Sequence, residues 1–143
     1  MSNHTAVVKW SHDNSLFTDG KYSRVHNWTF DGGAVVSASS SPHVVKVPYS
    51  DPTCVDPEEA FIASLSSCHM LFFLGFASKA GYLVDSYTDT AEGHMAKNEV
   101  GKVAVTSVTL LFIQLNVFKK DLRCGLNVSA RMFLYGMFWV FCP

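Results

Sequence analysis

A single long helix with marked ends is the feature that most constrains this fold. Residues 55–81 carry start signals for this helix. Asp56 can cap the first turn with a side-chain oxygen, and the missing N–H of Pro57 costs nothing at the first helical position. Gly81 can adopt the left-handed conformation that ends a helix. Between these signals the segment is almost entirely apolar, and it holds one reactive side chain, Cys68. That thiol is either core filling or a nucleophile, and the two interpretations lead to different functions.

Strand patterns precede this helix. Residues 5–10 and 22–30 show the alternation of a sheet, and the Asp-Gly-Gly sequence at 31–33 predicts a turn into a partner strand at 34–38. We therefore expect a β-hairpin over 22–38. Residues 39–55 contain three prolines and several serines, which favour an extended loop leading to the helix.

Strand patterns also follow the helix. Residues 82–91 and the β-branched segment 103–110 are predicted strands, separated by a polar turn at 97–102. The order of strands, helix and strands predicts an α+β domain with the helix packed on antiparallel sheet. We expect residues 1–143 to form one domain.

Composition excludes several classes of function. A net charge of −1 gives no electrostatic reason to expect nucleic acid or an anionic membrane surface as a partner. The first residues show no signal peptide, so we expect a cytoplasmic protein with reduced cysteines. Apolar runs at 70–77 and 132–142 are shorter than the roughly 20 residues of a membrane span. The spacing of Cys and His predicts no metal site, and we expect no cofactor.

Small residues precede Cys68 and leave space beside it for a substrate or for a second helix. Ala63 and Ser64 lie one turn earlier on the predicted helix. Arg24 lies on a predicted strand that could pack nearby, and a positive group near sulfur favours the reactive thiolate. The alternative for Arg24 is a cross-strand surface partner, and the alternative for Glu58 is ordinary first-turn helix charge.

The sequence here resembles a known family. Val-Asp-Pro-Glu-Glu at 55–59, followed by Ala-Ser-Leu-Ser-Ser-Cys-His at 63–69, is similar to the first-cysteine motif of the OsmC/Ohr family of osmotically inducible proteins and organic hydroperoxide reductases. The hairpin Tyr-Ser-Arg-Val-His-Asn-Trp-Thr-Phe-Asp-Gly-Gly at 22–33 resembles the OsmC-like branch. The resemblance covers about residues 6–110.

The resemblance implies an antioxidant thiol peroxidase that forms an intertwined homodimer with its active sites at the subunit interface. Cys68 would be the peroxidatic cysteine, which reduces an organic hydroperoxide to an alcohol and becomes a sulfenic acid. Glu58 matches the family glutamate that pairs with an arginine beside the thiolate, and Arg24 is the best candidate for that arginine. Glu58 and Cys68 are ten residues apart, or about 15 Å along a straight helix. We therefore predict that a Glu58–Arg24 pair near Cys68 comes at least partly from a second subunit.

The tail departs from the family pattern. Residues 111–143 carry neither the family's second-cysteine helix nor its final strand, which is what a frameshift, a truncated reading frame or a chimeric sequence produces. Three outcomes stay open for the sulfenic acid. Cys124 or Cys142 resolves it, an external thiol reduces it, or the protein keeps the fold without turnover. A non-catalytic dimeric module that binds an apolar ligand or partner is the alternative function.

Overall fold

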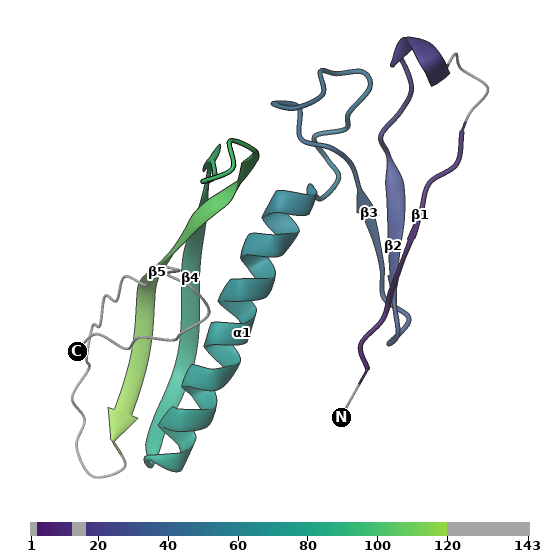
Figure 1. Ribbon diagram of the computed structural model, residues 1–143. Coiled ribbons are helices and arrows are strands. Elements are labelled where there is room, and N and C mark those ends of the chain that lie inside the picture. Colours follow the sequence, from purple (N-terminus) through teal and green to yellow (C-terminus); the bar gives the residue numbers. More distant parts are fainter. Residues whose placement is uncertain (1–2, 13–16, 120–143) are drawn as a thin grey trace. The chain divides into compact units, whose positions relative to one another are not determined.

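The computed structural model, shown in Figure 1, describes residues 3–12 and 17–119. The chain divides into two compact units, Met1–Ala60 and Phe61–Pro143, with the boundary inside the first turn of the long helix. Cys124, Cys142 and most of the tail discussed above lie outside the described residues. Antiparallel sheets and one long helix in the described part confirm the predicted α+β class.

The first unit contains a three-stranded antiparallel sheet in the order β1-β2-β3. Its strands are β1 (Ala6–Lys9), β2 (His26–Phe30) and β3 (Val35–Ala38), and a short 3₁₀ helix, η1 (Phe17–Asp19), lies between the first two in sequence. The strand predicted over 22–30 is shorter than expected. Residues 22–25 instead form hydrogen bonds between side chains and main chain within the same segment.

The predicted hairpin is confirmed. Phe30 N–H donates to Ala34 O at 3.0 Å, and Gly33 N–H donates to Phe30 O at 2.9 Å. Gly33 has a φ of 84°, which a side-chain-bearing residue rarely adopts. The Asp-Gly-Gly sequence therefore closes β2 onto β3 in the way that the turn chemistry indicates.

The predicted loop at 39–55 is fixed to the first unit at two points. Val55 N–H donates to Ser37 O, and Ser39 N–H donates to Val55 O, both at 3.0 Å. Arg24 N–H donates to Tyr49 O at 2.8 Å. These bonds hold the end of the loop beside β3, so that the start of the helix is placed within the same unit as Arg24.

The long helix is α1 (Pro57–Lys79), and its predicted ends are confirmed. Glu59 N–H donates to Asp56 Oδ1 at 2.9 Å, and Asp56 N–H donates to Glu59 Oε2 at 3.2 Å, a reciprocal capping box. At the other end Gly81 has a φ of 78° and donates to Ser78 O at 3.1 Å.

The second unit pairs β4 (Tyr82–Lys97) with β5 (Val103–Lys119) as an antiparallel ribbon. Both strands are longer than predicted. β5 continues through Leu111 to Lys119, past the point at which the sequence departs from the family pattern. The extension carries aromatic and β-branched residues, which suit a strand, and its backbone pairs with Tyr82–Thr90 of β4.

One face of α1 packs along β4. Ile62, Ser66, His69 and Phe73 lie on this face at helical spacing, and their contacts run antiparallel to β4. A Cβ at Gly93 would lie 2.3 Å from Ile62 Cδ1, so the glycine permits the close approach of the helix. On β5, Val108 and Leu110 are 2% and 1% exposed and form the centre of this core.

Candidate functional site

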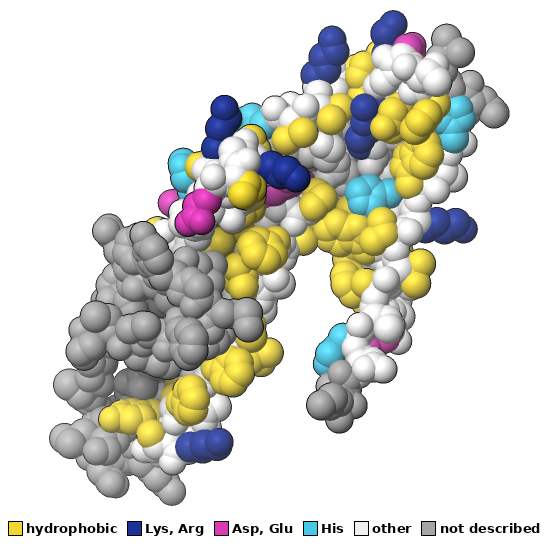
Figure 2. Space-filling view, in the orientation of Figure 1, with side chains coloured by type: hydrophobic (Ala, Val, Ile, Leu, Met, Phe, Trp, Pro, Cys, Tyr) yellow, Lys and Arg dark blue, Asp and Glu magenta, His cyan; other side chains and the backbone are white. Residues whose placement is uncertain are grey.

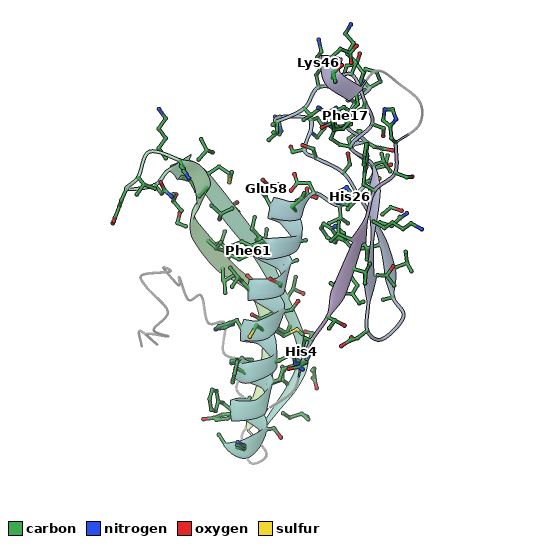
Figure 3. The ribbon with its side chains drawn as sticks, turned by 45° about the vertical axis from the view of Figure 1, so that its right-hand side comes forward. His4, Phe17, His26, Lys46, Glu58 and Phe61 are labelled. Carbon is green, nitrogen blue, oxygen red and sulfur yellow. The ribbon has the colours of Figure 1, made fainter. Side chains whose placement is uncertain are left out.

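The first unit contains an open pocket of about 460 Å³ whose wall is mostly apolar. Two of the residues predicted to form the site, Arg24 and Glu58, lie on this wall, and so does His26. Figure 3 labels His26 and Glu58 together with Phe17, another wall residue. The remaining residues of the wall are Val8, Trp10, Tyr22, Ser40, Val44 and Pro57.

Aromatic contacts build one side of the pocket. The Tyr22 ring stacks on Phe17, with ring centroids 4.5 Å apart and an interplanar angle of 28°, and meets Trp10 edge-on at 5.5 Å. Trp10 Nε1–H donates to Ser23 O at 2.8 Å, which fixes the indole against the segment after η1. The aromatic wall is therefore tied to the main chain at Ser23.

Arg24 is held by its own neighbourhood. Its Nη1 donates to Gly20 O at 2.9 Å and also to Tyr22 O, and its Cζ lies 3.6 Å from the centroid of the Tyr22 ring. A guanidinium over an aromatic face is stabilised by the ring's electron density. Because these contacts use only one of its terminal nitrogens, Arg24 retains donors for an acceptor in the pocket.

The two adjacent glutamates at the start of α1 have different roles. Glu59 completes the capping box with Asp56, whereas Glu58, one residue earlier, is half-buried on the pocket wall. Within the described residues no ion pair joins Glu58 to Arg24. The structure thus brings the two predicted residues to one pocket without direct pairing.

Cys68 is not among the residues of this pocket. It is exposed, and it lies on the face of α1 opposite to the one that packs on β4. At 100° per residue, Phe61, Leu71 and Phe72 lie within about 60° of Cys68 around the helix. Their side chains are 47%, 66% and 54% exposed, and Figure 2 shows hydrophobic side chains gathered along α1. The thiol therefore sits in an uncovered apolar strip of its own chain.

The opposite face of α1 carries a polar cluster that the sequence analysis missed. Ser66 Oγ donates to Asp89 Oδ2 at 2.5 Å, and His69 Nδ1 lies 3.2 Å from Tyr87 Oη. Burial lowers the pKa of His69, although the Asp89 carboxylate opposes the shift. Burial and the same carboxylate raise the pKa of Tyr87. His69 is only 7% exposed and lies about 100° around the helix from Cys68, so it is a packed histidine of the α1–β4 contact.

Cys54 differs from Cys68 in its surroundings. It follows Asp51 in a turn where Thr53 N–H donates to Asp51 Oδ1 at 2.9 Å, a bond that lowers the pKa of that carboxyl. Desolvation and the Asp51 charge raise the pKa of the Cys54 thiol. The thiol form of Cys54 is therefore favoured over the reactive thiolate.

No group of three or more His, Cys, Asp or Glu residues that could hold a metal ion is found within the described part of the chain. By length and composition alone, α1 could cross a membrane. The apolar run at 70–77 by itself predicts no membrane span, because it is too short. The whole helix reaches the required length and hydropathy when its small residues are included. Its caps and its polar contacts to β4 are those of a helix in a folded domain.

The fold is thus a capped helix set on a long antiparallel ribbon, accompanied by a small antiparallel sheet, with a thiol midway along the helix. A search of the solved structures finds an OsmC-like protein of unknown function from Vibrio cholerae O1 biovar eltor. It is 55% identical, has a TM-score of 0.73, and the match covers 80% of this chain and 77% of that one. The chain belongs to the OsmC-like family, whose soluble fold makes α1 a core helix. No family profile and no curated protein matches the chain.

Proposed function

We propose that this protein is a cytoplasmic, cysteine-dependent peroxidase that reduces organic hydroperoxides to alcohols in an oxidative stress response. The Cys68 thiolate would attack the distal peroxide oxygen, so that an S–O bond forms while the O–O bond breaks. The sulfur is oxidised to a sulfenic acid, and the peroxide oxygens are reduced, leaving an alkoxide that takes up a proton. Two equivalents of an external thiol would then reduce the sulfenic acid to the Cys68 thiol, with release of water and of the oxidised external disulfide.

The observation that carries this proposal is the exposure of Cys68 within an apolar strip. A buried helical cysteine is usually inert, but this thiol is open to reagents on the outer face of α1. Phe61 and Leu71 beside it offer an apolar surface suited to the organic part of a hydroperoxide. Arg24 and Glu58 would stabilise the thiolate and the developing charge from the pocket wall.

Helix geometry supports a dimeric site. Glu58 shares a pocket with Arg24 of its own chain, yet it lies about 15 Å along α1 from its own Cys68. The Cys68 of one chain would therefore meet the Arg24–Glu58 pocket of a second copy. An intertwined homodimer would also cover the exposed strip on α1.

Sulfenic acid formation tests the proposal. The protein is mixed with an alkyl hydroperoxide such as cumene hydroperoxide, and one sulfenic acid per chain is expected by intact-mass measurement after trapping. Cys68→Ser should abolish the product, whereas Cys54→Ser, the matched control, should not. A product that persists in Cys68→Ser, or none at all in the wild-type protein, would refute the peroxidase proposal.

The alternative is a non-catalytic dimeric module that binds an apolar ligand. The specific observation in its favour is that the aromatic pocket is formed without Cys68. Binding of cumyl alcohol by calorimetry, together with no thiol loss in hydroperoxide, would support this module in place of the enzyme.

A further inference from the structure

We infer that His26 is a third catalytic residue of the Arg24–Glu58 pocket, moving a proton from the Cys68 thiol to the departing alkoxide. This inference rests on the proposed peroxidase function. The motif resemblance assigns no role to His26. The proposed reaction also leaves open which group carries the proton from the Cys68 thiol to the alkoxide.

The hydrogen bond of His26 determines which of its nitrogens carries hydrogen. Nδ1 lies 2.8 Å from Arg24 O, and a carbonyl oxygen can only accept, so Nδ1 is the donor. In the neutral ring the second nitrogen, Nε2, then carries a lone pair. Within the described residues Nε2 has no hydrogen-bond partner.

The His26 side chain lies on the pocket wall. Nδ1 is bound to the main chain two residues earlier on the same segment, so Nε2 is the ring nitrogen left to accept a proton. His26 is half-buried on the pocket wall with Arg24 and Glu58, and its ring also contacts Trp28 with centroids 5.8 Å apart. These contacts hold the imidazole in place, as a positioned acid or base requires.

The proposed transfer balances. Nε2 accepts the proton of the Cys68 thiol, and the thiolate attacks the distal oxygen of the hydroperoxide. The S–O bond forms as the O–O bond breaks, so sulfur is oxidised and the peroxide is reduced. The alkoxide oxygen then takes the proton from Nε2–H, and His26 returns to its neutral form. Arg24 cannot replace it, because a guanidinium stays protonated in proteins.

The substitution His26→Asn tests this role. The Asn side-chain amide can replace Nδ1–H as a donor to Arg24 O, but it has no equivalent of Nε2. Two oxidants are compared by the rate of sulfenic acid formation. With tert-butyl hydroperoxide, whose alkoxide is a poor leaving group, the rate should fall about 100-fold, a typical loss for a general acid. With peracetic acid, which releases acetate without needing a proton, only the help in removing the thiol proton is lost, so the rate should fall less.

Two controls complete the experiment. His43→Asn removes an exposed histidine of the 39–55 loop that is not on the pocket wall, and it should leave both rates unchanged. In the wild-type protein, without any substitution, the alkyl hydroperoxide reaction should slow in D₂O more than the peracid reaction does. A His26→Asn variant that slows both oxidants equally, or neither, would overturn the inference, as would equal solvent isotope effects in the wild-type protein. Failure of wild-type Cys68 to react with either oxidant would instead refute the peroxidase proposal itself, and this inference with it.

Discussion

The two faces of α1 differ in the side chains that they bury and expose. The face turned to β4 carries Ser66 and His69, both hydrogen-bonded to side chains of that strand. The outer face carries Phe61, Leu71 and Phe72 around Cys68, all substantially exposed. The inner face therefore buries hydrogen-bonded polar side chains beside Ile62 and Phe73, whereas the outer face leaves large apolar side chains exposed.

The difference indicates what each face contacts. Polar groups can be buried when they are hydrogen-bonded, and the inner face meets that condition through Asp89 and Tyr87. Apolar groups in water gain nothing until another surface covers them. We therefore expect the inner face to stabilise the chain's own fold and the outer face to stabilise its association with a second copy.

The largest expected effect is on association. Leu71→Glu places a charge in the exposed strip, and a two-fold dimer contains the substitution twice. Losing the burial of two leucines at 1.5–3 kcal/mol each raises the dissociation constant of the dimer by at least about 100-fold. Sedimentation equilibrium should therefore show monomers at concentrations where the wild-type protein is dimeric.

A matched control separates this effect from a general loss of solubility. Val100→Glu changes a side chain that is 76% exposed in the turn between β4 and β5, and it should leave the dimer intact. A wild-type protein that is monomeric at high concentration, or a Leu71→Glu protein that stays dimeric, would contradict the role assigned to the outer face.

The inner face should respond in stability instead. Ser66→Ala removes the hydrogen bond to Asp89 Oδ2, although Asp89 Oδ1 is already buried without a partner among the described residues. Leaving the second carboxylate oxygen unsatisfied costs about 1–3 kcal/mol in the free energy of unfolding. Urea denaturation at fixed protein concentration measures this loss.

Ser64→Ala is the matched control on the outer side of the helix. Ser64 Oγ donates to Phe61 O at 2.7 Å, but both groups are exposed, so water can replace the bond. The change in stability should stay within about 0.5 kcal/mol. Equal effects for the two serines would mean that the inner cluster contributes nothing specific to the fold.

The ends of α1 and the hairpin turn could be predicted from the sequence because each depends on local chemistry. Each of these features depends only on residues that are close in sequence, as the cap at Asp56 and the positive φ of Gly33 and Gly81 show. The two faces of α1 could not be predicted, since the helix is apolar almost all round and its few polar residues give no period. The length of β5 was missed because pairing with β4, which is a tertiary interaction, decides where the strand ends.

The candidate site was predicted in part. The motif resemblance suggested Arg24 and Glu58, which the structure brings to one pocket, and Cys68, which lies elsewhere along α1. His26 gave no signal of its own in the sequence, because its significance depends on the hydrogen bond to Arg24 O and on the folding of the 39–55 loop. The alternation of β2 alone could have indicated that His26 and Trp28 share a face.

A smaller effect is expected at the start of α1, where the two faces begin. Asp56→Ala removes the bond to Glu59 N–H and should cost about 1 kcal/mol of stability. Glu58→Gln keeps the size of the adjacent glutamate and removes its charge, so it should change stability by less than about 0.5 kcal/mol while slowing sulfenic acid formation. Thermal unfolding and the trapping assay give the two readouts. A Glu58→Gln protein with unchanged reactivity would remove Glu58 from the proposed site.

The smallest expected effect is a pH dependence that belongs to the inner face. Burial lowers the pKa of His69 in the folded protein below its ordinary value of 6.5, so the unfolded chain binds the proton more readily. Its neutral form stabilises the fold fully above pH 6.5. That contribution is lost as the pH falls from 6.5 through the lower folded-state pKa, and no further loss occurs below it. Asp89, which favours the protonated ring, keeps the effect small.

The measurement compares Tm against pH for three proteins at fixed concentration. His69→Asn should fall less steeply than the wild-type protein between pH 6.5 and 5, because it has no ring to protonate. His94→Asn, which removes an exposed histidine of β4, should follow the wild-type curve. Parallel curves for all three would show that His69 is not kept neutral by burial. Water would then reach the His69 ring on the inner face of α1. The contrast with the outer face would depend on the Ser66–Asp89 hydrogen bond alone.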